Sequence, residues 1–226
     1  MGKIFSICLF LLFFQNTFLM AQQGVKFGLR AGYSMATQYG IIEPDIPYNV
    51  DVYYRHGLAG GLLIYYPVTE SFGIQQEFLY VQKGSAEDIA LKDRPINTRT
   101  EYDINYFEIP MVMRLTFARI KNCKIYLTSG FALSILLDGE YRLNGAADFE
   151  EGLLTFSDTN KINGVDIFDY GFLYGGGAEG IVFGRQCFFE YRFTIGWNTL
   201  MMPTVKGEAP APLRNQDYIF TVGLYL

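Results

Sequence analysis

The segment FFEYRFTIGWNTL at 188–200 alternates between large apolar side chains and polar or small ones. Because side chains on a β-strand point in turn to the two faces of a sheet, one face of this segment is apolar and the other carries charge. Soluble sandwiches, lipocalin-like barrels and membrane barrels can all contain such a strand, and they differ in what covers the apolar face. The other segments of the chain must therefore decide between these architectures.

Eight segments in all show this alternation, so we expect an all-β chain. Phe and Tyr together number 37 and Gly numbers 24, and no segment shows the 3.6-residue spacing of an amphipathic helix. Most of the segments have ten residues or more, which suits strands that cross a bilayer at a tilt. The expected strands are 25–35, 57–66, 72–83, 102–117, 124–137, 170–183, 187–198 and 218–226.

Short and long connections alternate strictly between these strands. The short connections lie around 67–70, 118–122 and 184–186, and the long ones cover 36–56, 84–101, 138–169 and 199–217. Outer-membrane barrels show this rhythm because their periplasmic turns are tight and their extracellular loops are extended. We therefore predict an eight-stranded antiparallel up-and-down transmembrane β-barrel in the outer membrane of a Gram-negative cell envelope, with both termini in the periplasm.

The less apolar face of the strands indicates which side meets the membrane. It carries small residues such as Gly57 and Gly61 and isolated charges, whereas a water-exposed face needs many long polar side chains. Small residues suit a narrow lumen, where they leave room for long side chains from facing strands. The other face is strongly apolar, as in segment 107–115. We therefore expect the apolar face to contact lipid, with Glu190 and Arg192 pointing into the lumen.

The first residues are predicted to form a secretory signal peptide. Lys3 precedes an apolar run at 4–14, and Ala21 is a small residue suited to cleavage. The run is too short to span a bilayer. We expect residues 1–21 to be removed and residues 22–226 to form one outer-membrane barrel domain.

The composition of the mature chain argues against nucleic acid as a partner. It would hold 17 basic and 23 acidic residues, a net charge of −6, without a basic patch. After residue 21 there is also no apolar stretch long enough for a transmembrane helix.

Six charged side chains fall on the expected lumen face. An eight-stranded barrel has an interior just wide enough for side chains, so we expect a structural network of salt bridges there. A polar pathway or a proton site is the alternative. We expect no catalytic residue, no cofactor and no metal site. The six residues are Glu77, Glu108, Arg114, Glu179, Glu190 and Arg192.

Histidine and cysteine give little sign of chemistry. His56, the single histidine, is expected at the rim of the second strand, and no nucleophile elbow or paired acid accompanies it. Cys123 and Cys187 are expected at the periplasmic ends of two strands that a third strand separates. Two strand spacings exceed the reach of an unstrained disulfide, so we expect both thiols to be free.

Several of these segments resemble the PorT-type outer-membrane β-barrel domain family of Bacteroidetes, and the resemblance extends over essentially the whole mature sequence. It lies in KFGLRAGYS (26–34), FGIQQEFLYVQKGS (72–85), INYFEIPMVMRL (104–115), YGFLYGGGAEGIVF (170–183) and the strands FFEYRFTIGW and DYIFTVGLYL. The resemblance implies an eight-stranded outer-membrane barrel. The founding member belongs to a protein-secretion apparatus, and most relatives have no assigned activity.

The sequence as a whole predicts a monomeric barrel without catalytic activity, surrounded by outer-membrane lipid, that is a structural or partner-binding component of the envelope. The family resemblance links it to secretion. The alternatives are a membrane-embedded lipid-modifying enzyme and a barrel that binds small solutes or lipids. The extracellular loop 138–169 holds eight acidic residues against Arg142 and Lys161, with apolar side chains among them. It is expected either to bind a protein partner or to cap the mouth of the barrel with its own apolar residues.

Overall fold

The computed structural model describes residues 24–40, 48–91, 96–149, 152–162, 166–198, 200–201 and 212–226. The predicted signal peptide, residues 1–21, lies outside them. Within the described ranges no helix is long and apolar enough to cross a membrane. The strands are β1 (Lys26–Gly40), β2 (Tyr48–Pro67), β3 (Phe72–Leu91), β4 (Ile96–Ile120), β5 (Cys123–Phe149), β6 (Gly152–Lys161), β7 (Phe168–Val182), β8 (Arg185–Gly196), β9 (Leu200–Met201) and β10 (Pro212–Tyr225).

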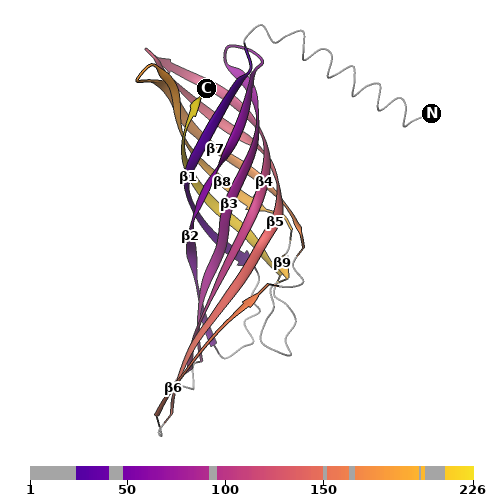
Figure 1. The fold of residues 1–226 in the computed structure, drawn as a ribbon, viewed down its shortest axis with the longest axis vertical. Coiled ribbons are helices and arrows are strands. Elements are labelled where there is room, and N and C mark those ends of the chain that lie inside the picture. Colours follow the sequence, from indigo (N-terminus) through magenta and orange to yellow (C-terminus); the bar gives the residue numbers. More distant parts are fainter. Residues whose placement is uncertain are drawn as a thin grey trace, which may run out of the picture.

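Eight of these strands form a closed antiparallel ring (Figure 1). Their order is β1-β2-β3-β4-β5-β7-β8-β10, and β10 pairs with β1 from Gly28↔Tyr225 to Gly40↔Leu213, which closes the ring. Each strand is thus hydrogen-bonded on both sides within the ring, so no edge remains there. The predicted eight-stranded up-and-down barrel is confirmed.

The tight turns lie at one end of the barrel, here called the turn end, with the start of β1 and the end of β10. They comprise residues 68–71, 121–122 and 183–184. Phe183 and Gly184 have φ values of 49° and 76°, the type I′ arrangement that joins two antiparallel strands without splaying them. The turn end is uppermost in Figure 1, and we call the opposite end the loop end.

Several strands continue past the ring at the loop end and form an open sheet, here called the extension. It runs downwards in Figure 1 and ends near β6. β1 pairs with β2 only as far as Arg55, and β7 pairs with β5 only as far as Ile135, so neither accompanies the extension. The extension consists of residues 48–54 of β2, 84–91 of β3, 96–105 of β4, 138–149 of β5 and all of β6.

The assignment of 84–101 and 138–169 to long loops is therefore wrong over most of their length. β3 continues to Leu91, β5 continues to Phe149, and β6 pairs back onto β5. Near the ring one face of the extension is still covered, because Thr100, Tyr102 and Ile104 are buried. Residues 154–161 of β6 are exposed on both faces, so the apolar alternation that marks a membrane strand is lost there while the backbone ladder continues. The loops 36–56 and 199–217 are likewise shortened by β1, β2, β9 and β10.

Gly84 lies where β3 passes from the ring into the extension. Its φ is 141°, and a Cβ at this position would lie 1.8 Å from the carbonyl oxygen of Tyr102 on β4. Only glycine suits such a backbone and such a close approach. On the other side of β3, the register with β2 shifts between Tyr54 and Ala59. Irregularities of this kind bend and twist a strand, and here they accompany the change from barrel to open sheet.

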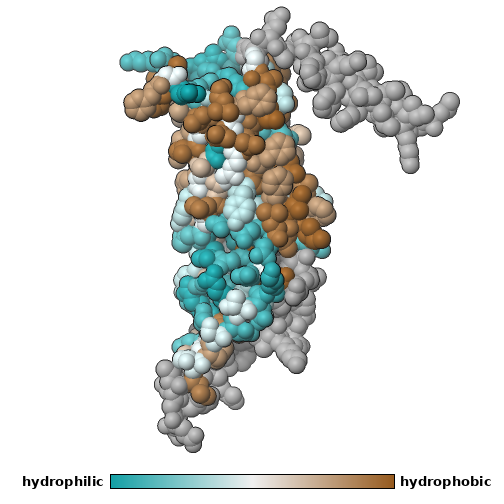
Figure 2. Space-filling view, in the orientation of Figure 1, coloured by the Kyte–Doolittle hydropathy of each residue, from teal (hydrophilic) through white to brown (hydrophobic). Residues whose placement is uncertain are grey.

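Exposed apolar side chains gather on the turn-side half of the barrel, whereas the visible surface of the extension is mostly hydrophilic (Figure 2). An apolar band of this kind is what the lipid-facing side of an outer-membrane barrel presents. It extends over strands on all sides of the ring, so we call it the belt. It includes Phe27, Leu29, Leu58, Leu62, Met111, Met113, Leu115, Phe117, Leu127, Phe131, Ile181, Phe189 and Val222.

Aromatic rings pack against one another on the outer face of β7, β8 and β10. Phe193 lies between Tyr174 and Tyr218, with ring centroids 5.3 and 4.7 Å away. Tyr191 stacks on Tyr218 at 6.2 Å. Tyrosines of this kind are typical of the interface between membrane and water, where the ring is apolar and the hydroxyl meets water.

The belt predicts a position-dependent cost for a new charge. Leu62 is 55% exposed on the outer face of β2. Leu62→Arg should destabilise the folded protein by about 2–4 kcal/mol, because the guanidinium would enter lipid. Leu154, 64% exposed on β6 in the extension, should tolerate Leu154→Arg within about 0.5 kcal/mol. Folding titrations into liposomes measure both values. Equal losses would show that the belt does not face lipid.

Candidate functional site

Two arginines and two glutamates form a buried group in the lumen, here called the tetrad. Arg30 Nη1 donates to Glu77 Oε1 at 2.6 Å, and Arg30 Nη2 donates to Glu190 Oε1 at 2.8 Å. Arg192 binds both oxygens of Glu77 at 2.8 Å and Glu190 Oε1 at 2.5 Å. β8 and β3 lie on opposite sides of the ring, so the Arg192–Glu77 pair spans the lumen.

The tetrad is electrically balanced. Each carboxylate lies between two guanidinium groups, so its charge is compensated where almost no water reaches it. Charge-assisted pairs with this geometry are strong, and an unpaired charge in the same place would be costly. Gly175, opposite Arg192 in the register, contributes space, because a Cβ there would lie 2.1 Å from the carbonyl oxygen of Tyr191.

On the loop side of the tetrad lies a layer with more acidic than basic groups. Lys83 Nζ is 2.6 Å from Glu108 Oε1 and 2.7 Å from Asp217 Oδ1. Asn215 Nδ2 donates to Asp169 Oδ2 at 2.9 Å. Lys83, Glu108, Asp169 and Asp217 are all buried, so this layer holds three carboxyl groups and one ammonium group, which is paired with two of them.

On the turn side lies a layer centred on Arg114. Arg114 is paired with Glu179 and donates to the Tyr225 hydroxyl at 2.6 Å. Its guanidinium carbon lies 3.5 Å from the centroid of the Tyr126 ring, a cation–π arrangement. Lys124 Nζ reaches Glu179 at 3.2 Å. β4 and β10 are on opposite sides of the ring, so the Arg114–Tyr225 bond is a second contact across the lumen.

All six lumen residues named from the sequence lie in these layers: Glu77 and Glu190 with Arg192, Glu108 with Lys83, and Arg114 with Glu179. Sequence reasoning missed four partners, namely Arg30, Lys83, Asp169 and Asp217. The same alternation could have found Arg30 and Lys83, because both lie on polar faces of recognised strands. Asp169 and Asp217 lie at strand ends, within the segments 138–169 and 199–217 that the sequence predicts to be loops.

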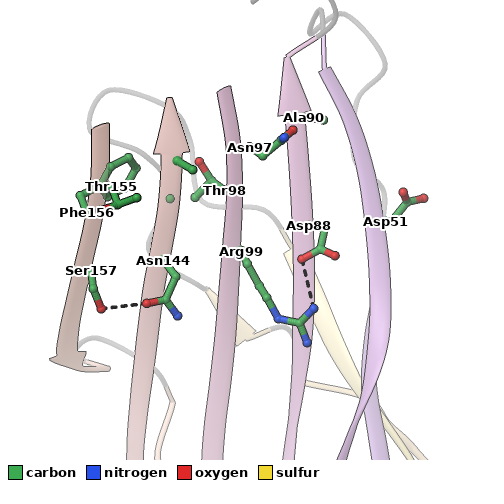
Figure 3. Close-up of a pocket in the computed structure, with 12 residues that line it drawn as sticks. Asp51, Asp88, Ala90, Asn97, Thr98, Arg99, Asn144, Thr155, Phe156 and Ser157 are labelled. Atoms are coloured by element: carbon green, nitrogen blue, oxygen red, sulfur yellow. Dashed lines mark hydrogen bonds and ion pairs between the residues drawn. The ribbon is translucent and has the colours of Figure 1, made fainter. Parts of the chain in front are cut away.

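A second candidate site lies on the extension, in a groove of about 760 Å³ (Figure 3). Arg99 in its centre pairs with Asp88 at 3.5 Å and with Glu101 at 3.0 Å. Ser157 Oγ donates to Asn144 Oδ1 at 2.8 Å, which ties β6 to β5. The groove therefore offers amide, hydroxyl and charged groups for polar contacts with another molecule.

Acidic residues exceed basic residues on the extension. Asp103, at its base, is paired with Arg55 and with Arg142, the latter at 2.7 Å, and its hydrogen bond raises the pKa of Arg55. Lys161 lies 3.8 Å from Asp138. The acidic residues are Asp51, Glu87, Asp88, Glu101, Asp103, Asp138, Glu140, Asp148 and Asp158, against the basic residues Arg99, Arg142 and Lys161.

His56, Cys123 and Cys187 do not lie in a recognisable reactive arrangement. The His56 ring stacks on Tyr33 with centroids 5.6 Å apart, and its Nδ1 is hydrogen-bonded to the Tyr33 hydroxyl. Cys123 and Cys187 are both free. In the described ranges, no group of three or more His, Cys, Asp or Glu side chains is arranged to hold a metal ion.

Comparison with known proteins relates the chain to outer-membrane barrels. Residues 20–201 match the family described as outer membrane protein beta-barrel domain. No curated protein sequence matches the chain.

Solved structures that resemble it share few identical residues. The attachment invasion locus protein Ail of Yersinia pestis is 8% identical, covers 89% of this chain and 98% of its own, and has a TM-score of 0.41. Neisserial surface protein A is 12% identical, with coverages of 89% and 99% and a TM-score of 0.43. The outer membrane protease OmpT of Escherichia coli is 10% identical, with coverages of 89% and 95% and a TM-score of 0.42.

The tetrad predicts a large loss of stability when one member is removed. Glu77→Ala should cost about 3–5 kcal/mol, because it leaves Arg30 and Arg192 buried without their shared carboxylate. Glu70→Ala removes an exposed pair with Arg119 and should cost no more than about 1 kcal/mol. Denaturant unfolding followed by the fluorescence of Trp197, the single tryptophan, measures both. Similar losses would contradict a structural role for the tetrad.

The lumen should conduct ions poorly. Arg192–Glu77 and Arg114–Tyr225 join opposite walls at two levels, so little space remains for a continuous water column. Planar-bilayer recordings of the purified protein should show no stable porin-like conductance. Large, stable conductance steps would mean that these contacts do not close the lumen.

Proposed function

The chain belongs to the outer membrane protein beta-barrel domain family, and we propose that it acts in the outer membrane as a non-catalytic component of the cell envelope that binds a protein partner. The barrel anchors the chain in lipid, and the extension is the binding surface. We propose a monomer whose turn end faces the periplasm and whose extension projects outside the cell. Tight turns at one end and long connections at the other support this orientation.

The observation that carries the proposal is the length of the strands. A tilted strand needs about 9–11 residues to cross a bilayer. β4 has 25 residues and β5 has 27, so both continue well beyond the belt. The additional length builds a sheet that the ring strands do not cover, whereas the lumen is filled by paired charges. Among the described residues, the extension therefore offers the surface best suited to contact another protein.

The charge of the extension supports a basic partner. Its three basic side chains are already paired with acids, while Asp51, Glu140 and Asp158 have no basic side chain within 4.0 Å among the described residues. Unpaired acids on an exposed surface steer a basic protein towards it and favour the correct orientation. The resemblance to the PorT-type family supports a role linked to protein secretion, in which such a partner would be another envelope component.

Shortening the hairpin of β5 and β6 tests the proposal. A variant in which a short Gly-Ser linker replaces residues 141–160 should keep the barrel intact. The ring pairs β5 with β7 only from Lys124 to Ile135, and the variant keeps all of these residues. Heat-modifiable migration on gels should remain, and crosslinking in native membranes should no longer yield the partner found with the full chain. A matched variant with an equal linker inserted at the turn 121–122 controls for the insertion itself. Unchanged crosslinking to the same partner would refute the role of the hairpin.

A further inference from the structure

β6 is the outermost strand of the extension. Within the described part of the chain it pairs only with β5, from Glu140↔Lys161 to Phe149↔Gly152. Its other side therefore presents a row of backbone N–H and C=O groups with no strand of the described ranges beside it. Such an edge can accept a further strand from another chain, and proteins commonly protect long edges against this with proline, bulges or very short strands. β6 has ten residues, no proline and an unbroken register.

Side-chain contacts fix the register of β6 on β5. Phe156 lies opposite Gly145, and a Cβ on Gly145 would lie 2.0 Å from Phe156 Cζ, so the ring covers the space that the glycine leaves. Packing of an aromatic ring over a cross-strand glycine is a known way of pinning a register. The hydrogen bond from Ser157 to Asn144, which lie opposite each other, also holds this register. The edge is therefore held in one arrangement before a partner arrives, which lowers the entropic cost of binding.

The backbone geometry shows which groups point to the open side. Ile162 N–H donates to the Gly139 carbonyl at 2.8 Å, so this pair is a hydrogen-bonded pair of the antiparallel ladder. Such pairs alternate with non-hydrogen-bonded pairs along two antiparallel strands. The even-numbered residues of β6 consequently point their backbone groups at β5. The odd-numbered ones, which include Thr155, Ser157 and Thr159, point theirs away from β5.

The side chains beside this edge indicate the kind of strand that would fit. Leu154 and Phe156, which are 64% and 45% exposed, lie on one face of β6 and would be covered by apolar side chains on the same face of an added strand. Asp158 follows on that face, and the surrounding sheet has the acidic excess described above. A strand with apolar and basic residues in alternation matches both features.

We propose that the open edge of β6 binds an extended basic segment of a protein partner by β-strand addition. The proposal rests on the function proposed above and specifies how the extension would engage its partner: backbone hydrogen bonds give affinity, and side chains flanking Leu154, Phe156 and Asp158 give selectivity. A second copy of this chain is disfavoured as occupant, because pairing two β6 edges would bring two acidic sheets together.

The test uses the purified full chain in detergent and a fluorescent ten-residue peptide that alternates valine and lysine. Thr155→Pro and Thr159→Pro each remove an N–H that points to the open side, and proline is tolerated at such edge positions because no bond to β5 is lost. Each proline should weaken binding roughly fivefold to tenfold, the effect of one lost hydrogen bond. Thr155→Ala and Thr159→Ala keep the N–H and should bind like the parent chain. A peptide alternating valine and glutamate should bind more weakly than the lysine peptide.

The outcomes separate this proposal from the function on which it rests. Three outcomes would overturn strand addition. The lysine peptide would show no saturable binding, or it would bind the proline variants as tightly as the parent, or the alanine variants would lose as much affinity as the proline variants. Light scattering that shows a dimer of the parent and a monomer of the proline variants would assign the edge to a second copy instead, and would also overturn it. The shortened hairpin variant could lose crosslinking to the native partner while the proline variants still bind the peptide like the parent. This result would refute only strand addition and would leave the extension as the binding surface.

Discussion

Eight strands enclose a space so narrow that side chains from opposite walls touch, and this closeness governs the rest of the molecule. Charges that point into such a space cannot keep their water, so each must find an opposite charge or a hydrogen-bond partner across the lumen. The tetrad meets this demand with two arginines and two glutamates, and Arg114 meets it with Glu179 and Tyr225. The charged groups thus form part of the core of the barrel, together with buried apolar clusters such as Leu63 with Phe188 and Leu79 with Ile219.

The alternation of side chains predicts this part of the structure well. A period of two separates the two faces of each strand, and it correctly identifies all eight strands of the ring. It also indicates that residues such as Glu77 and Arg192 point inward. It does not indicate which charges meet, because β3 and β8 are 115 residues apart at this contact and only the closed ring brings them together.

The extension could not be predicted in the same way. Alternation of apolar and polar residues marks a strand only when one face is shielded from water. At the base of the extension Tyr102 and Ile104 still lie on such a face, but β6 is exposed on both faces. The signals of the extension are local and weak: Gly84 at the bend, Gly145 opposite Phe156, and Ser157 opposite Asn144. Each depends on knowing which residue lies on the neighbouring strand. The sequence therefore indicates where the membrane strands lie, while the parts that are available to another protein emerge only from the pairing of strands.

The tetrad also has a consequence for the order in which the barrel assembles. Arg30 on β1 meets Glu190 on β8, 160 residues later, so this bond cannot form until the C-terminal strands are in place. Contacts between such distant parts of a chain form late, because the intervening loop must be closed first. A partly assembled sheet would hold these charges without their partners. Joining β1 to β10 is then the step that brings them together. The two ion pairs that join β8 to the early strands β1 and β3, Arg30–Glu190 and Arg192–Glu77, would have to break if that seam reopened, so the closure of the ring also protects it against reopening.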